Sequence, residues 1–276
     1  MTLRTLYRFC TYLLLVVLLF WLLFPIYWIF IVSIKPGSLL FTWPPTYIPI
    51  PPTLGNYSEA IKTRPLIPTM TNSLIVMVVS TATSVLIASL AAFALARYRF
   101  RGREVLRYGI LFIRMLPAMI IAIPLFVQFQ RIGLFDSLLS LIIVYTAFNL
   151  PFNVWMLTGF LEEVPRELED AARIDGCNAW QLYSTIFMPL VAPGLVASII
   201  FCMLLAWNEF QFALILTYTL KSQTLPIVVA GMWNDRGIYF GQMAASGMIT
   251  ILPVLALGLF IQRYLVQGLT AGAVKG

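Results

Sequence analysis

The sequence predicts an all-α integral membrane protein. Hydrophobic residues make up 61% of its 276 residues and charged residues only 11%, whereas soluble domains carry about 25% charged residues. A soluble fold of this composition would expose large apolar patches to water. Six apolar runs are each long enough to cross a bilayer, which takes about 20 residues. Helices are expected because lipid offers no hydrogen-bond partner to a bare backbone.

The six predicted spans cover residues 10–33, 69–96, 107–130, 137–160, 187–216 and 240–262. The first follows Arg4 and Arg8 and is longer than the core of a signal peptide, about 7–15 residues, with no small-x-small cleavage site after it. It is therefore expected to be retained. We expect one transmembrane domain over residues 1–276, with a core of about 69–262.

The connection after the first span, residues 35–67, is dense in proline. Proline fixes φ and removes a backbone donor, so an extended segment is expected there. Orientation follows from the Lys and Arg residues. With the N-terminus inside, eleven of them fall on the inner side and six on the outer side, and Arg114 lies within the third span. The positive-inside rule therefore places both termini in the cytoplasm.

Several function classes are excluded or unsupported. The chain contains no His, which removes His-based catalysis and His-ligated metal sites. Its three cysteines show no metal or redox spacing. No phosphate-binding G-x-x-x-x-G-K-[ST] motif is present, because none of the four lysines follows a glycine. The net charge of +7 is explained by anchoring of the inner loops rather than by nucleic-acid binding.

The loop between the fourth and fifth spans, residues 161–186, differs from the other short loops. Pro165 suits the first turn of a helix, and the acids that follow it suit the positive end of the helix dipole. Gly176 is a good helix terminator. Asn178 and Gln181 have the spacing of a capping box at the start of a second helix. The loop is therefore predicted to form two helices joined by a sharp turn.

The charge of this loop is unusual for an inner loop, because six acids stand against two arginines. An anionic segment is repelled by anionic lipid and docks more readily onto a protein. Ala171 and Ala172 would let the partner's backbone approach closely. The alternative is an amphipathic helix that lies on the membrane surface.

This loop resembles the signature of importer-type ABC permeases, Glu-Ala-Ala-x3-Gly-x9-Ile-x-Leu-Pro. Here the signature stands as Asp170-Ala171-Ala172, then Gly176, then Ile186-Phe187-Met188-Pro189, so Asp replaces Glu and Met replaces Leu. Further segments are similar to the six-span, maltose-type sugar permeases. They are Ser33–Pro36, Asn72-Ser73, Arg97–Arg103, Trp207–Phe210 and the tail 268–276.

The resemblance implies a non-catalytic permease subunit of an ATP-driven importer of a sugar or sugar derivative in the bacterial plasma (inner) membrane. It implies four kinds of partner: a second homologous permease, a dimer of cytoplasmic ATPase subunits, an extracytoplasmic sugar-binding protein and membrane lipid. ATP and Mg would be bound by the ATPase, and this chain would carry no cofactor. The residues implied in ATPase coupling are Glu169, Asp170, Ala171, Ala172, Asp175, Gly176, Ile186, Met188 and Pro189.

Polar residues inside spans are costly and invite a functional hypothesis. The substrate-path candidates are Asn153, Trp207, Asn208 and Glu209. The alternative for Asn208 and Glu209 is that they hold the spans together or pair with Arg114. The alternative for Asn153 is contact with neighbouring helices, and that for Trp207 is a place at the membrane interface. The competing function is an ion-coupled secondary transporter for a small polar solute. An intramembrane enzyme lacks any supporting motif.

Overall fold

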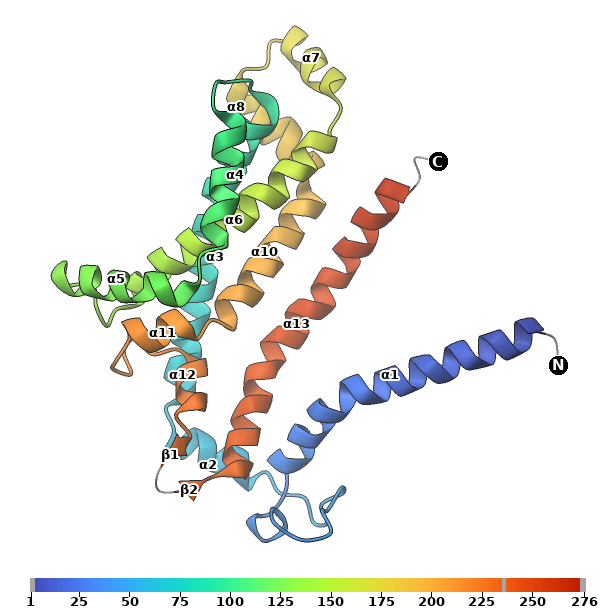
Figure 1. Ribbon diagram of the computed structural model, residues 1–276, viewed down its shortest axis with the longest axis vertical. Coiled ribbons are helices and arrows are strands. Elements are labelled where there is room, and N and C mark those ends of the chain that lie inside the picture. The colour runs from blue at the N-terminus through green and yellow to red at the C-terminus, as the bar shows by residue number, and fades with distance from the viewer. Residues whose placement is uncertain (1–2, 235–236, 274–276) are drawn as a thin grey trace. The chain divides into compact units, whose positions relative to one another are not determined.

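The computed structural model describes residues 3–234 and 237–273 (Figure 1). Lys275 and the last three residues of the tail motif therefore lie outside the described residues. The chain divides into two compact units, one of residues 1–66 with 228–252 and the other of residues 67–227 with 253–276.

The described part of the chain is almost entirely helical, which confirms the predicted class. The helices are α1 (Leu3–Ser33), α2 (Gly55–Thr63), α3 (Leu66–Arg97), α4 (Arg103–Arg114), α5 (Ala118–Arg131), α6 (Leu138–Glu163), α7 (Arg166–Ile174), α8 (Ala179–Gln181), α9 (Met188–Leu190), α10 (Ala192–Trp207), α11 (Gln211–Leu216), α12 (Leu225–Ala230) and α13 (Phe240–Ala273). A 3-10 turn, Gly37–Leu39, and a π-helical segment, Leu182–Phe187, complete the helical elements. The strands β1 (Trp233–Asn234) and β2 (Gly237–Ile238) form a short antiparallel pair.

Four of the described helices are long and apolar enough to cross a membrane, and two bent helix pairs bring the number to six if each pair is one span. The span expected over residues 107–130 is not one straight helix, because α4 and α5 meet at 89°. Pro117 is the N-cap of α5 and has no N–H to continue α4. The run 187–216 is likewise broken, first by a bend of 78° before α10 and again before α11.

In the first unit, the proline-rich connection is not extended throughout, which corrects the prediction for residues 35–67. The helix α2 occupies the stretch between Pro52 and Pro65, where proline is absent and every N–H can bond. The Asn56 amide on α2 donates to the carbonyls of Ser33 at 2.9 Å and Lys35 at 2.8 Å. The turn that leaves α1 is therefore fixed by α2.

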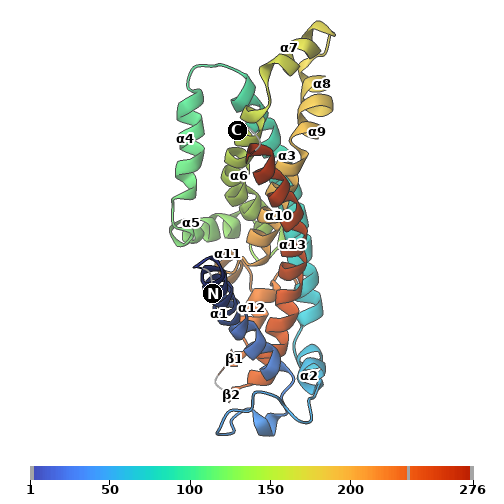
Figure 2. The ribbon, with the colours of Figure 1, turned by 90° about the vertical axis from the view of Figure 1, so that its right-hand side faces the viewer.

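In the second unit, α6 packs against α4, α10 and α11, and α11 also packs against α5 (Figures 1 and 2). Leu141, Leu157 and Leu161 on α6 are fully buried. A Cβ added to Gly194 would lie 2.4 Å from the Phe160 ring, so glycine is what lets α10 approach α6 at this point. This closely packed helical bundle carries α7 at one end (Figures 1 and 2).

Candidate functional site

The acidic loop folds as predicted into two helical arms joined by a glycine turn. Pro165 is the N-cap of α7, and Glu167 and Glu169 lie in its first turn, where the helix dipole favours negative charge. The loop thus forms a short helix that stands at the end of the bundle instead of continuing α6.

Gly176 ends α7 with a φ of +86°, in the left-handed region that glycine adopts without strain. The Gly176 N–H donates to the Arg173 carbonyl at 3.1 Å and the Cys177 N–H to the Ala172 carbonyl at 3.0 Å. This pair of hydrogen bonds is a Schellman motif, which satisfies carbonyls that the helix end leaves free. The predicted role of Gly176 as terminator is confirmed.

The second arm begins with the capping box expected from the sequence. The Gln181 N–H donates to Asn178 Oδ1, and the Asn178 N–H donates to Gln181 Oε1, each at 2.9 Å. The second arm then continues through α8 into the π-helical segment. Ile186 and Met188 are half-buried against the core, while Pro189 is exposed.

The nine signature residues divide between two faces of the loop. Glu169 and Ala172 are buried against the bundle, with exposed fractions of 9% and 5%. Asp170, Ala171, Asp175 and Gly176 are exposed. Ile174, on the outward side of α7, is 86% exposed.

Some of the loop's acids are neutralised within the chain. Glu162 accepts hydrogen bonds from Arg103 at 3.0 Å and from Arg107 at 3.0 and 3.2 Å. Glu169 accepts a hydrogen bond from Arg173 at 2.7 Å. The remaining four acids, Glu163, Glu167, Asp170 and Asp175, make no hydrogen bond or ion pair with any described residue. The outward face of α7 is therefore both acidic and apolar.

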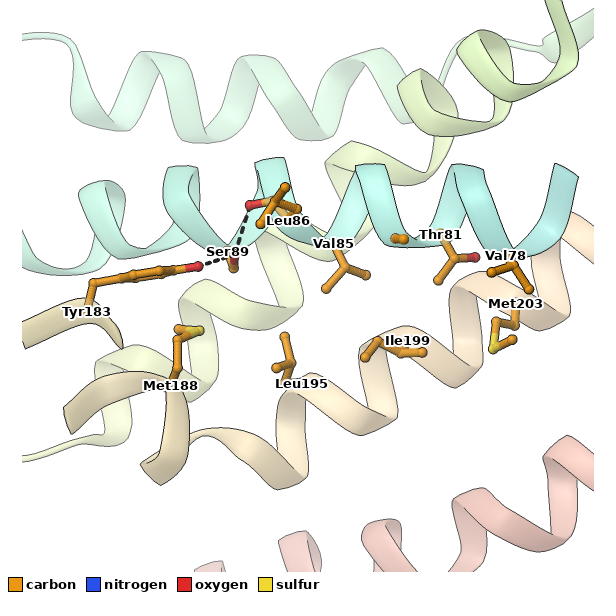
Figure 3. A pocket seen from close by; sticks show the side chains of 11 residues that line it. Val78, Thr81, Val85, Leu86, Ser89, Tyr183, Met188, Leu195, Ile199 and Met203 are labelled. Atoms are coloured by element: carbon orange, nitrogen blue, oxygen red, sulfur yellow. Dashed lines mark hydrogen bonds between the residues drawn. The ribbon is translucent and has the colours of Figure 1, made fainter. Parts of the chain in front are cut away.

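A groove of about 440 Å³ lies beside the second arm. It is bounded by α3 on one side and by the second arm and α10 on the other (Figure 3). Its lining is mostly apolar and includes Val85, Met188, Leu195 and Ile199. At one end, the hydroxyls of Ser89 and Tyr183 lie 2.7 Å apart. Met188 of the signature thus faces a space between two long helices.

Asn153, proposed as a substrate-path residue, is fully buried between helices. Its Nδ2 donates to Ser84 Oγ on α3 at 3.0 Å, and its Oδ1 accepts from Ser198 Oγ on α10 at 2.5 Å. Asn153 on α6 therefore links its own helix to α3 and α10, as polar residues between membrane helices commonly do.

The other three candidates lie at the end of α10. Trp207 is 1% exposed, and Asn208 is exposed but donates to the Leu204 carbonyl at 2.8 Å. Glu209 accepts from the Tyr145 hydroxyl at 2.5 Å and from the N–H groups of Phe212 and Ala213 at 2.8 and 3.2 Å. The carboxylate therefore caps α11. The structure brings these three residues together, and it leaves Asn153 on a separate buried network.

Arg114 does not pair with Glu209. Its guanidinium donates to the Phe148 carbonyl at 2.9 Å and lies 5.7 Å from the centre of the Phe152 ring. The ion pair considered as an alternative is therefore wrong, and each of the two charges has its own polar partner.

Sequence reasoning missed a second polar centre, around Asp136. Its carboxylate accepts hydrogen bonds from the backbone N–H groups of Tyr218 and Thr219 at 2.8 and 2.9 Å, and also from the hydroxyls of Thr219 and Ser222. Burial raises the pKa of Asp136, but these hydrogen bonds outweigh burial and hold the pKa well below its usual value. The only sequence signal was Asp136 standing alone between two apolar runs.

Asn72 holds the same loop from α3. Its amide donates to the carbonyls of Leu220, Lys221 and Gln223 at 3.1, 3.3 and 2.9 Å. The neighbouring Ser73 accepts a hydrogen bond from the Leu225 N–H at 2.8 Å. The Asn72-Ser73 pair noted in the sequence therefore organises the connection between α11 and α12.

Fold and site together define a multi-pass membrane protein with an exposed acidic helix at one end of its helical bundle. The family described as binding-protein-dependent transport system inner membrane component matches residues 84–271. The chain belongs to this family. Membership in a binding-protein-dependent family does not support the alternative of an ion-coupled secondary transporter.

Relatives of similar length match along nearly the whole chain. The diacetylchitobiose uptake system permease protein DasC of Streptomyces coelicolor is 35% identical over 95% of this chain and 95% of its own length. The trehalose transport system permease protein SugB of Mycobacterium tuberculosis is 35% identical, with 92% and 93% covered. The trehalose/maltose transport system permease protein MalG of Thermococcus litoralis is 34% identical, with 92% of each covered.

The fold is also similar to that of solved transporter chains. A chain of a bacterial ABC transporter involved in import of the acidic polysaccharide alginate matches with a TM-score of 0.81 and 23% identity, covering 94% of this chain and 96% of its own. A chain of the methionine ABC transporter MetNI matches with a TM-score of 0.59 and 18% identity, covering 72% and 93%. These likenesses concern the fold alone.

Proposed function

We propose that this chain is a permease subunit of an ATP-driven importer that moves a sugar or sugar derivative across the bacterial plasma (inner) membrane. Family membership supports transport, and relatives named for uptake of diacetylchitobiose and trehalose support the substrate class. The sugar is carried between helices that span the membrane. The chain itself carries out no covalent chemistry.

In this proposal the chain is one permease domain of six spans with both termini in the cytoplasm, each bent helix pair counting as one span. The distribution of Lys and Arg supports this orientation. Contacts within the second unit agree with it, because Arg103 and Arg107 of the basic run, defined as residues 97–107, bind Glu162 where the acidic loop begins. The basic run and the acidic loop thus lie at the same end of the bundle.

The observation that carries the proposal is the outward face of α7. Its exposed acids have no partner in the described chain, and Ile174 offers an apolar contact beside them. A separate ATPase subunit with a basic rim and an apolar cleft would cover both features. ATP and Mg would be bound by that subunit, since the present sequence has no phosphate-binding loop.

The remaining partners follow from the family. A second, homologous permease would complete the pathway, and an extracytoplasmic binding protein would deliver the sugar. In this proposal Asp170, Ala171 and Asp175 contact the ATPase, Gly176 sets the turn, and Glu169 and Ala172 seat α7 on the bundle. Ile186, Met188 and Pro189 carry its motion toward α10.

The charge reversal Asp170→Lys tests this assignment. Asp170 is exposed and unpaired within the described chain, so the variant should insert and fold normally. Retention of the ATPase on the tagged chain should fall about tenfold or more, because a like charge would now face a basic surface. Glu104→Lys, which changes an exposed acid on α4, is the matched control and should retain the ATPase. Equal retention in both variants would contradict docking through α7.

A further inference from the structure

The last residue of α3, Arg97, is a buried arginine with an exposed fraction of 9%. The sequence placed it among the positive residues of the inner side and in the segment Arg97–Arg103 that resembles sugar permeases, but gave it no structural role. Its guanidinium reaches the end of α6, where it donates to the carbonyls of Leu161 and, at 2.8 Å, Val164. The last carbonyls of a helix lack intrahelical partners and carry partial negative charge. Arg97 thus binds the point where α6 ends and the acidic loop begins.

The same guanidinium touches α7. Its Nη1 lies 4.0 Å from Glu169, the acid that is buried between α7 and the bundle. Arg173 holds the other side of this carboxylate at 2.7 Å. Glu169 is therefore fixed between an arginine of its own helix and an arginine of α3.

The second arm of the loop also meets Arg97. The Arg97 guanidinium carbon lies 4.3 Å from the centre of the Phe187 ring, within the range of a cation–π contact. Phe187 is fully buried and ends the π-helical segment. The centre of its ring lies 5.3 Å from the centre of the Phe93 ring. One side chain therefore contacts both arms of the loop, before and after the Gly176 turn.

The contacts of Arg97 fix the geometry of the acidic loop more than they stabilise the fold. Burying a charge is costly, and apolar replacements of buried ionic groups are often neutral or stabilising. Arg97 Nε finds no acceptor among the described residues, so its hydrogen bonding is incomplete. A planar guanidinium can bind two carbonyls, a carboxylate and a ring face at once, whereas the ammonium of lysine is a point charge.

We propose that Arg97 is a positioning residue that locks the two arms of the acidic loop to α3, so that a displacement of α7 is passed to residues 182–191. The π-helical segment and the bend before α10 lie directly along this route, and π-helical turns often occur at functional sites. This inference rests on the proposed function, because it assumes that a partner moves α7.

The test is hydrogen exchange on the complex purified from its native membrane. The complex is measured with and without Mg-ATP plus vanadate, which traps the ATPase. In the wild-type chain, trapping should change exchange in α7 and in residues 182–191. In Arg97→Met, exchange in α7 should be about tenfold faster at rest, and trapping should no longer change residues 182–191. Arg97→Lys should restore part of this response.

Arg101→Met is the matched control, because Arg101 is an exposed arginine of the same basic run. It should respond like the wild-type chain. A merely structural role for Arg97 would loosen α7 without removing the response of residues 182–191 to trapping. An undiminished response in Arg97→Met would therefore overturn the inference.

If the complex does not assemble with Arg97→Met, the variants Glu169→Gln and Arg97→Lys test the inference instead. Both should weaken the response at residues 182–191, and a wild-type response in both would overturn the inference. A wild-type complex without an ATPase, or one that shows no change anywhere on trapping, would instead contradict the proposed function. The two failures are thus distinguishable.

Discussion

Among single residues, polar side chains in the apolar runs form hydrogen bonds with other side chains of the fold more often than the sequence suggests. Asn153 and Glu209 attract attention as rare polar residues in apolar runs. Their partners, Ser84, Ser198 and Tyr145, are also polar and lie far away in sequence. Which polar residues meet depends on helix packing, and periodicity alone does not give that packing.

Glu209→Ala tests whether this carboxylate acts through the fold. Loss of the α11 cap should cost about 1 kcal/mol, and leaving the Tyr145 hydroxyl without its acceptor should add about 1–3 kcal/mol. Thermal unfolding of the purified chain measures the change, with the exposed Gln211→Ala as control. Unchanged stability together with altered substrate affinity would favour the substrate-path role, which stays a prediction.

Asp136→Asn should destabilise the loop between α11 and α12 by about 2 kcal/mol near neutral pH, because hydrogen bonds to a charged acceptor are strong. Since the folded state lowers the pKa of Asp136, the carboxylate contributes its full stability above the usual value of 3.8. That contribution is lost as the pH falls from there toward the lower folded pKa.

Unfolding measured at pH 7 and pH 3 should therefore show a smaller difference between wild type and Asp136→Asn at pH 3. The exposed Glu163→Gln is the control and should show little difference at either pH. A gap that stays constant or grows on acidification would contradict the role of Asp136 as a charged acceptor.

At the scale of elements, local signals predicted the acidic loop well. The helix start at Pro165, the stop at Gly176 and the capping box at Asn178 each depend on a few neighbouring residues, and all three are present in the structure. The breaks at Pro117 and before α10 were not predicted, because a 20-residue apolar run looks the same whether straight or bent. The helix α2 was not predicted for another reason: its nine residues lie inside a proline-rich segment, where an extended chain is expected.

Gly176→Ala should destabilise the turn by roughly 1–2 kcal/mol, the cost of a left-handed backbone in a residue with a Cβ. The new Cβ would meet nothing within 4 Å, so the effect would come from the backbone alone. Gly159→Ala, within α6 and near its C-terminal end, is the control and should be neutral or stabilising, since glycine weakens a helix. Equal effects in thermal unfolding would contradict the Schellman assignment.

At the scale of the whole molecule, composition and the signature loop were sufficient to predict a helical membrane protein and its family. The residues that lock the loop to the bundle, Arg97 above all, could not be found this way. Their role depends on contacts between helix ends that are 64 or more residues apart in sequence.

The proposed function requires this chain to work as a permease within an ATP-driven complex. We would first purify the tagged chain from its native membrane by affinity and identify the chains that co-purify. A P-loop ATPase and a second permease of the same family should co-purify, and the ATPase should be lost or reduced when Asp170 is changed to Lys. Recovery of the chain alone, or only with further copies of itself, in a detergent that keeps other membrane complexes intact, would contradict the proposed function.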